Sequence, residues 1–206
     1  MIYGEVKSKT SHLDHKDINV KKVKIEDSVY GIFICDHCSF YTDRIHDAAV
    51  IKNNQIVDGP SFQLRNNVNV NCLENSIIEN GTPRVRKNLK GNILSLLTGG
   101  GGNANYWHWL FDVLPRLKIY LSINSNLEKI DYFLFPSLTT SFQKETLDLL
   151  NISKKKRLSS KNYRHLISDR IIVTSHPYTL LNDPDIDSLN IPLWLSKFLR
   201  DSFLKK

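Results

Sequence analysis

Residues 92–117, NILSLLTGGGGNANYWHWLFDVLPRL, place an apolar run, four consecutive glycines and a helical pattern in direct succession. The apolar run at 92–97 predicts a buried strand. After Asn105 apolar residues recur at three- and four-residue steps, which predicts a helix to about Ile123. A glycine-rich turn between a strand and a helix is where α/β proteins bring backbone amides close to a ligand. The stretch therefore predicts an α/β unit with a binding loop, although a plain flexible turn explains the glycines equally well.

The rest of the second half repeats this alternation. Residues 131–136 (DYFLFP) and 170–174 (RIIVT) predict two further buried strands, and residues 141–150 (SFQKETLDLL) predict an amphipathic helix between them. Strands that alternate with helices at this spacing favour a parallel sheet of the α/β type.

The first part of the chain differs, because it consists of short runs rich in β-branched and aromatic residues between about residues 20 and 70. Asn53-Asn54 predicts a tight hairpin, since asparagine tolerates the positive φ that such a turn needs. Gly59-Pro60 predicts a turn, residues 66–71 predict an exposed or edge strand, and residues 79–90 predict a loop.

These patterns divide the chain into three predicted parts. Residues 1–90 form a β-rich segment and residues 91–175 an α/β segment. Residues 176–206 begin with a proline-containing connection and end in an amphipathic helix at 194–204.

Composition narrows the choice of protein class only slightly. The 206 residues are 41% hydrophobic, which suffices for a core, and no apolar run approaches the roughly 20 residues of a membrane-spanning helix. The net charge of +7 suits a nucleic acid, an anionic membrane surface or a phosphorylated small molecule, so charge does not decide between them. We expect the three cysteines, Cys35, Cys38 and Cys72, to be free thiols, and the protein to be cytoplasmic.

The predicted helix carries polar side chains along one edge. His108, Asp112 and Arg116 follow at i, i+4 steps, so one edge of the helix presents a base, a carboxylate and a cation. Pro115 removes a backbone hydrogen bond and predicts a kink near Asp112. Spacing alone slightly favours a structural interpretation, in which His108 is a core residue and the other two form a surface ion pair.

The string NYWHWLFDVLPRL (residues 105–117) resembles the N-Y/F-x-H-W-L-x-D-x-L-P-R-L segment of family 61 glycosyltransferases, formerly a domain of unknown function and common in polysaccharide biosynthesis proteins. At the level of patterns the resemblance covers roughly residues 45–206. It implies a two-lobed fold of the GT-B type, in which residues 91–175 are the Rossmann-like, acceptor-side lobe.

The resemblance also implies a reaction. A nucleotide-sugar donor would transfer its sugar with inversion to a saccharide or lipid-linked glycan acceptor, without an obligatory metal or other cofactor. Such transfer needs one general base, and we expect His108 in this role with Asp112 orienting it, although the reverse assignment stays open. The residues expected to bind substrate are Gly100, Gly101, Gly102, Asn103, Asn105 and Arg116.

Family members continue into a second domain with an S-R motif and an N-E pair, which this sequence lacks. We therefore expect an N-terminal fragment that does not transfer sugar by itself. No nucleic acid partner is expected, whereas a peripheral association with the inner face of a membrane is.

Two functions of other classes remain open. One is a non-enzymatic module that binds an anionic polymer or nucleic acid through the +7 charge, although basic and aromatic residues are not interleaved. The other is a nucleotide-dependent oxidoreductase, against which the absence of a third spaced glycine counts. The sequence Cys35-Asp36-His37-Cys38 has the spacing of half a zinc site, but too few further ligands follow to predict a metal.

Overall fold

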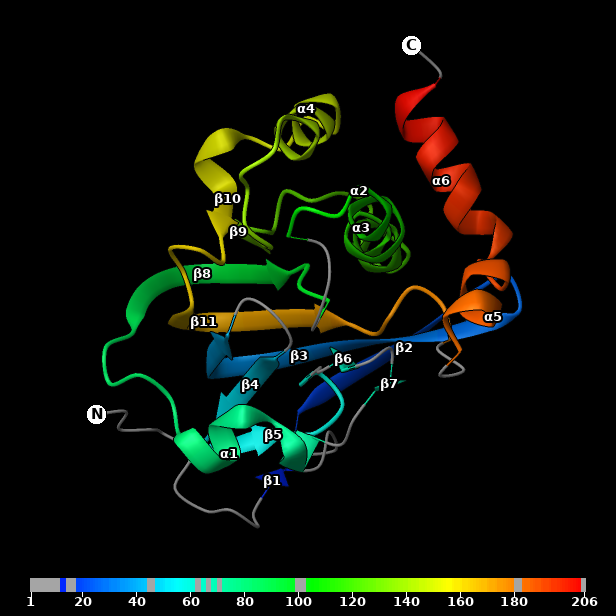
Figure 1. Ribbon diagram of the computed structural model, residues 1–206. Helices are drawn as coiled ribbons and strands as arrows, with labels where there is room; N and C mark the ends of the chain where they lie inside the picture. Colours follow the sequence, from blue (N-terminus) through cyan, green and yellow to red (C-terminus); the bar gives the residue numbers. More distant parts are fainter. Residues whose placement is uncertain are drawn as a thin grey trace.

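The computed structural model describes residues 12–13, 18–43, 47–61, 64–65, 68–69, 72–98, 103–179 and 183–204. Within these residues nine strands form one mixed sheet in the order β1-β5-β4-β3-β11-β8-β9-β10, with β2 paired to β3 (Figure 1). The strands are β1 (His12–Leu13), β2 (Asn19–Ile25), β3 (Ser28–Thr42), β4 (Ala48–Lys52), β5 (Gln55–Val57), β8 (Lys87–Ser95), β9 (Tyr132–Phe135), β10 (Arg157–Ser159) and β11 (His165–Thr174).

The predicted parallel half of the sheet is confirmed. Strands β8, β9 and β10 are parallel neighbours, and β11 returns to pair in parallel with the other side of β8. Three helices stand in the connections between β8, β9 and β10: α2 (Tyr106–His108), α3 (Pro115–Leu121) and α4 (Ser141–Leu149). Strand β10 was not predicted, because three residues behind a basic run give too short a signal.

The parallel strands form only one part of the sheet, which continues from β11 to β3 and its neighbours. Strand β11 pairs antiparallel with β3 over nearly its whole length, so strands from both predicted segments share one sheet. The predicted boundary after residue 90 falls inside β8. The protein is therefore a mixed α/β structure dominated by its sheet, and this architecture fits poorly with the predicted Rossmann-like lobe, whose sheet is mostly parallel and has helices on both faces.

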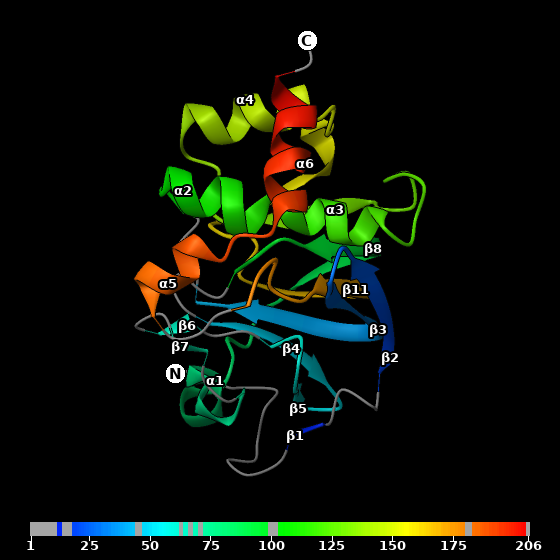
Figure 2. The same cartoon turned by 90° about the vertical axis from the view of Figure 1, so that its right-hand side faces the viewer.

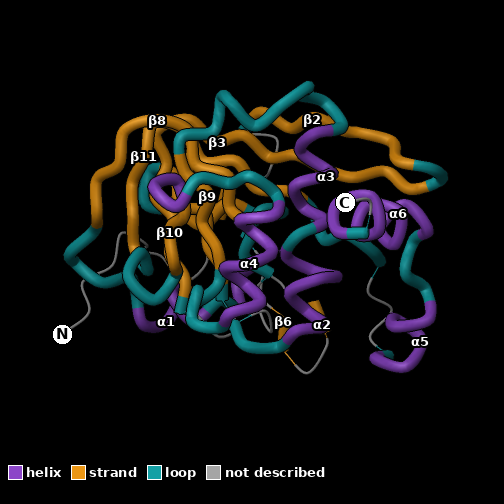
Figure 3. The backbone as a smooth tube through the Cα atoms, turned by 90° about the horizontal axis from the view of Figure 1, so that it is seen from above, coloured by secondary structure: helices purple, strands orange, loops and turns teal. Residues whose placement is uncertain are grey.

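Helices α2, α3, α4 and α6 (Leu193–Phe203) gather on one side of the sheet, whereas α1 (Ser76–Asn80) lies apart from them, beside β5 (Figures 1 and 3). The largest buried cluster lies on the side of the four gathered helices and joins Leu94 and Phe133 of the sheet to Trp109 and Leu117 of the helices. Burial of such side chains contributes about 1.5–3 kcal/mol each. A second cluster, with Phe40, Ile93 and Ile171, consists almost entirely of strand residues. No helix in the described part of the chain is both long and apolar enough to cross a membrane.

Helix α6 (Leu193–Phe203) confirms the predicted C-terminal helix and crosses the axis of α2 and α3 (Figure 2). Trp194 anchors it, since its Nε1 donates a hydrogen bond to the Tyr30 hydroxyl of β3 at 2.9 Å. A short helix, α5 (Pro184–Leu189), precedes it inside the segment that was interpreted only as a connection.

The N-terminal turns follow the sequence closely. Asn53 and Asn54 have φ values of 52° and 62° and form the predicted hairpin between β4 and β5. The loop predicted for residues 79–90 is wrong at both ends, because α1 (Ser76–Asn80) and β8 extend into it. Strands β6 (Leu64–Arg65) and β7 (Val68–Asn69) pair with each other. Of the exposed or edge strand predicted at 66–71, residues 66, 67, 70 and 71 lie outside the described residues.

The cysteines correct another prediction. Cys35 and Cys38 form a disulfide within β3, so the expectation of free thiols was wrong for this pair. Cys72 is a buried free thiol, and burial raises its pKa to about 12. The cytoplasmic location stays a prediction.

Strands β8 and β11 pair irregularly at one level of the sheet, next to the start of β9. The pairing of β11 with β8 shifts register beside Asp169, and Gly91 at this point has φ of 104°. The amide of Gly91 donates to Asp169 Oδ2 at 2.7 Å, and the Gly91 carbonyl accepts from Ser168 Oγ at 2.6 Å. The carboxylate of Asp131 closes the remaining space and accepts from the amide of Asn92 at 2.7 Å. Only glycine suits this position.

Replacing Gly91 with alanine tests this constraint. The new Cβ would overlap the Asp131 carboxylate, and alanine rarely adopts this φ. We expect the free energy of unfolding to fall by about 1–3 kcal/mol in chemical denaturation. Gly31→Ala is the matched control, because its Cβ would meet only the movable ring of Phe33. Equal losses in the two variants would contradict the role assigned to Gly91.

Candidate functional site

The predicted break in the site helix is a π-helical turn. Residues Trp109–Val113 form this turn between α2 and α3, and the amide of Leu114 donates to the carbonyl of Trp109, five residues back, at 3.1 Å. Pro115 then takes the first position of α3, where a missing N–H leaves no hydrogen bond unmade. The predicted irregularity near Asp112 is thus confirmed. Such π-turns occur frequently at functional sites.

The π-turn holds His108 and Asp112 in contact. Nδ1 of His108 lies 2.7 Å from Oδ2 of Asp112, and this hydrogen bond requires the proton on Nδ1, since a carboxylate only accepts. The second ring nitrogen, Nε2, then carries the lone pair of the neutral imidazole. The side chain of His108 is 28% exposed, whereas that of Asp112 is 1% exposed. The pair is therefore a half-buried base backed by a buried carboxylate.

Two further side chains reach this carboxylate from the segment that follows β11. The hydroxyl of Tyr178 donates to Asp112 Oδ1 at 2.7 Å. Nε2 of His176 lies 3.8 Å from the same oxygen, and Nδ1 of His176 lies 2.9 Å from the main-chain oxygen of Tyr178. Trp107 packs against both Tyr178 and His108, with ring centroids 6.2 Å and 5.2 Å away. The site thus combines residues from two elements distant in sequence.

Arg116 connects these two elements. Its guanidinium is completely buried and donates through Nε to the carbonyl of Asp112 at 3.0 Å and through Nη1 to the carbonyl of Thr174 at 2.7 Å. The carbonyl of Ser175 lies 3.3 Å from Nη1. Arg116 was predicted to bind substrate from an open helix edge, but the structure places it in the interior, where it joins the π-turn to the end of β11.

Burial and charge separate the two histidines of the site. The hydrogen bond to Asp112 raises the pKa of His108 above its ordinary value, while partial burial acts in the opposite direction. Burial lowers the pKa of His176 to about 4, so this histidine is neutral near neutral pH. Burial and the Asp112 charge raise the pKa of Tyr178, which keeps its hydroxyl protonated. Burial also lowers the pKa of Arg116 to about 10, which leaves it charged.

The predicted loop residues are placed only in part. Gly100, Gly101 and Gly102 lie outside the described residues. Oδ1 of Asn103 accepts from the amide of Ser137 at 2.9 Å, and its main-chain oxygen accepts from Gln143 Nε2 at 2.8 Å. These bonds join Asn103 to the connection between β9 and α4 and to α4 itself.

Asn105 begins the site helix. Its side-chain oxygen accepts from the amide of His108 at 3.2 Å, the capping interaction expected of an asparagine before a helix. The Asn105 oxygen therefore sets where the helix starts and so where His108 stands.

Sequence reasoning missed Tyr178 and His176. A usable signal was present, because HPY (residues 176–178) follows the predicted strand RIIVT (residues 170–174) after a single serine. The carboxyl ends of parallel strands meet at one edge of a sheet, and β8 and β11 are parallel. Residues just after β11 therefore had to lie near the helix that follows β8.

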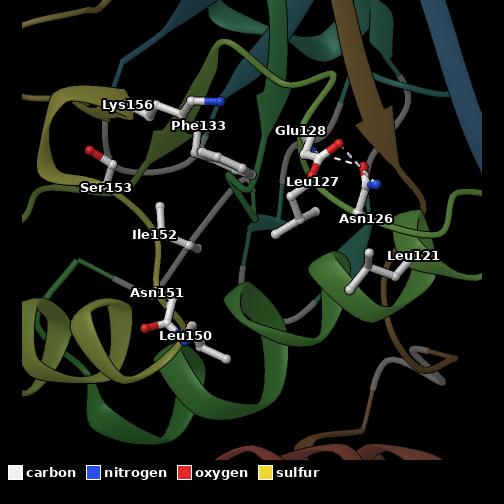
Figure 4. Close-up of a pocket in the computed structure, with 10 residues that line it drawn as sticks. All are labelled: Leu121, Asn126, Leu127, Glu128, Phe133, Leu150, Asn151, Ile152, Ser153 and Lys156. Atoms are coloured by element: carbon white, nitrogen blue, oxygen red, sulfur yellow. Dashed lines mark hydrogen bonds between the residues drawn. The ribbon is translucent and has the colours of Figure 1, made fainter.

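Two hollows flank the helices. An apolar groove of about 460 Å³ runs between α4, α6 and the site helix and is lined by Leu110, Phe111, Leu199 and Phe203 among others. A pocket of about 340 Å³ lies at the C-terminal end of α3, next to Leu121 (Figure 4). Its one lysine, Lys156, donates to the carbonyl of Ile130 at 2.6 Å. Neither hollow is lined by His108, Asp112, His176 or Tyr178.

The comparisons with known proteins do not assign the chain to a family. The chain matches no protein-family model, no curated protein and no solved structure. Among the described residues no group of three or more histidines, cysteines, aspartates or glutamates could hold a metal ion.

Arg116→Met tests the buried connection. It removes the donor shared by the Asp112 and Thr174 carbonyls and the guanidinium charge that acts on the Asp112 carboxylate. We expect a loss of about 3–5 kcal/mol in the free energy of unfolding, measured by chemical denaturation. The control is Arg170→Met, whose exposed pair with Asp36 should contribute under about 1 kcal/mol. A loss no larger than that of the control would contradict the connecting role.

Asp112→Asn tests the origin of the His108 titration. A neutral amide cannot stabilise the imidazolium as a carboxylate does, so the pKa of His108 should fall when followed by NMR. In the wild type the raised pKa adds stability that is present below about pH 6.5 and is lost as pH rises through the folded-state value. The variant should lose this contribution. Asp36→Asn, distant from the site, should leave the His108 titration unchanged, and an unchanged pKa in Asp112→Asn would refute the pairing.

Proposed function

We propose that His108 is the general base of a glycosyltransferase and that Asp112 orients it. The observation that carries the proposal is the 2.7 Å contact between His108 Nδ1 and Asp112 Oδ2, with the histidine half-buried and the carboxylate buried. A buried carboxylate behind Nδ1 fixes the tautomer and leaves Nε2 free to accept a proton. The resemblance of residues 105–117 to family 61 glycosyltransferases supplies the reaction class.

The proposed reaction moves one proton and one glycosyl group. Nε2 of His108 removes the proton from an acceptor hydroxyl as that oxygen attacks the anomeric carbon of a nucleotide-sugar. The bond from this carbon to the diphosphate breaks on the opposite face, so the configuration inverts and the nucleoside diphosphate leaves with the bonding electrons. The proton stays on His108, where Asp112 stabilises the imidazolium until solvent takes it.

The geometry favours this assignment over the reverse one. Asp112 is 1% exposed, and both of its oxygens already accept hydrogen bonds, from His108 and Tyr178. A base must reach the substrate proton, and the Asp112 carboxylate would have to break one of these bonds to do so. His108 needs no such rearrangement, which supports its role as the base.

The remaining parts of the proposal concern the substrate. We keep the backbone amides of Gly100, Gly101 and Gly102 as the groups that approach the leaving diphosphate, because they precede a helix in the chain. Arg116 becomes a positioning residue in the proposal, since its buried guanidinium joins protein carbonyls. A second lobe for the donor, a saccharide or lipid-linked acceptor, and a location at the cytoplasmic face of a membrane belong to the same proposal.

Substitution of the two residues tests the function. His108→Gln and Asp112→Asn should each lower the turnover of nucleotide-sugar by roughly 10²–10⁴-fold, the usual contribution of a general base. Turnover is measured as product glycan with the complete gene product, a panel of nucleotide-sugars and saccharide acceptors. His37→Asn is the matched control, because His37 is exposed and its φ of 54° suits asparagine.

The pH dependence gives an independent check. Because His108 must be neutral to act as a base, turnover should rise as pH increases through its raised pKa and should be lost below it. Wild-type turnover in both variants would exclude the site. Tight binding of a dinucleotide without any sugar transfer would favour the oxidoreductase alternative instead.

A further inference from the structure

The carboxylate of Asp112 is divided between two proton donors. Oδ2 accepts from His108 Nδ1 and Oδ1 accepts from the Tyr178 hydroxyl, each at 2.7 Å. The two donors come from different elements, since His108 ends α2 and Tyr178 follows β11. A change in one of these bonds therefore acts on the other through the charge that they share.

The hydrogen bonds from His108 and Tyr178 compete for the negative charge of the Asp112 carboxylate. A hydrogen bond to an ionised carboxylate stabilises its charge and lowers its affinity for a further proton. When Tyr178 donates to Oδ1, less negative charge is available to hold the proton of an imidazolium at Oδ2. The phenol stays in its donor form, because burial and the Asp112 charge raise the pKa of Tyr178 well above its ordinary value.

The other charged and titratable groups around this carboxylate do not replace Tyr178. His176 Nδ1 donates to the main-chain oxygen of Tyr178, so its neutral ring directs a lone pair and no proton from Nε2 toward Asp112, 3.8 Å away. Burial holds the pKa of His176 at about 4. Arg116 lies on the main-chain side and bonds to the Asp112 carbonyl, and Asp187 of α5 acts electrostatically on Tyr178.

We propose that Tyr178 is a positioning residue that limits how firmly Asp112 holds the proton on His108. Its hydroxyl fixes the carboxylate and takes up part of its charge, so Asp112 raises the pKa of His108 less than it would without Tyr178. The benefit to catalysis rests on the proposed function, whereas the effect on His108 protonation does not.

Two replacements of Tyr178 with opposite electronic effects test the proposal. Tyr178→Phe removes the donor, and we expect the pKa of His108, followed by NMR titration, to shift upward. Site-specific 3-fluorotyrosine at position 178 makes the phenol a stronger donor, and we expect a downward shift. Tyr163→Phe is the control, because the Tyr163 ring contacts Lys87 and lies outside the site, and it should shift nothing.

The opposite signs separate this role from a purely structural one. Shifts in the same direction in both variants, or no shift in either, would overturn the proposal. If Tyr178→Phe does not fold, the fluorotyrosine protein against the wild type decides alone, and an unchanged or raised pKa overturns the proposal.

Transfer assays then distinguish the two proposals. Opposite NMR shifts in a protein that transfers no sugar would support the role of Tyr178 and count against the glycosyltransferase function. Opposite shifts with the acid limb of turnover displaced by the same amount would support both. Normal turnover without any NMR shift would leave the function standing and overturn the role of Tyr178.

Discussion

The buried guanidinium of Arg116 joins the π-turn to the carboxyl end of β11 through the carbonyls of Asp112 and Thr174. Burial of a cation costs several kcal/mol unless hydrogen bonds and an opposite charge offset that cost. Asp112 supplies both, since its carbonyl accepts from the guanidinium and its carboxylate balances the charge. The same requirement brings the segment after β11 against the helix, where Tyr178 completes the surroundings of Asp112. The interaction that stabilises the interior thus also builds the candidate site.

Pro115 accounts for the break in the helix that carries His108, Asp112 and Arg116. Without an N–H at this position, the chain widens into a π-turn and restarts as α3. The side chain of His108 before the turn is half-buried, while Asp112 and Arg116 are buried. In a regular α-helix each of the two i, i+4 steps would rotate the side chain by only about 40° around the axis. The proline therefore separates the group that can meet a substrate from the groups that hold it in place.

The sequence was informative where the relevant contacts are local. The i, i+4 spacing placed His108 and Asp112 on one edge of the helix, and Pro115 predicted the helix irregularity. The pairing of the two side chains was expected only from the resemblance, because spacing alone favoured an ion pair between Asp112 and Arg116. The Asn53-Asn54 hairpin was predicted because its contacts are local. Tyr178 was missed because it lies 66 residues from its partner and approaches only after β11 inserts beside β8. The antiparallel pairing of β3 with β11 is equally distant, so the two predicted segments were not recognised as one sheet.

The central place of β11 also constrains the order of folding. Strand β3 is made early in the chain, yet its partner begins at His165, and the contact between Tyr30 and Trp194 spans 164 residues. Pairings of this separation form slowly, because the loop entropy is lost before the contacts are gained. During synthesis β3 therefore waits with one edge unpaired, a state prone to association with other chains. This edge of β3 stays exposed until residues 165–174 have been made and can pair with it.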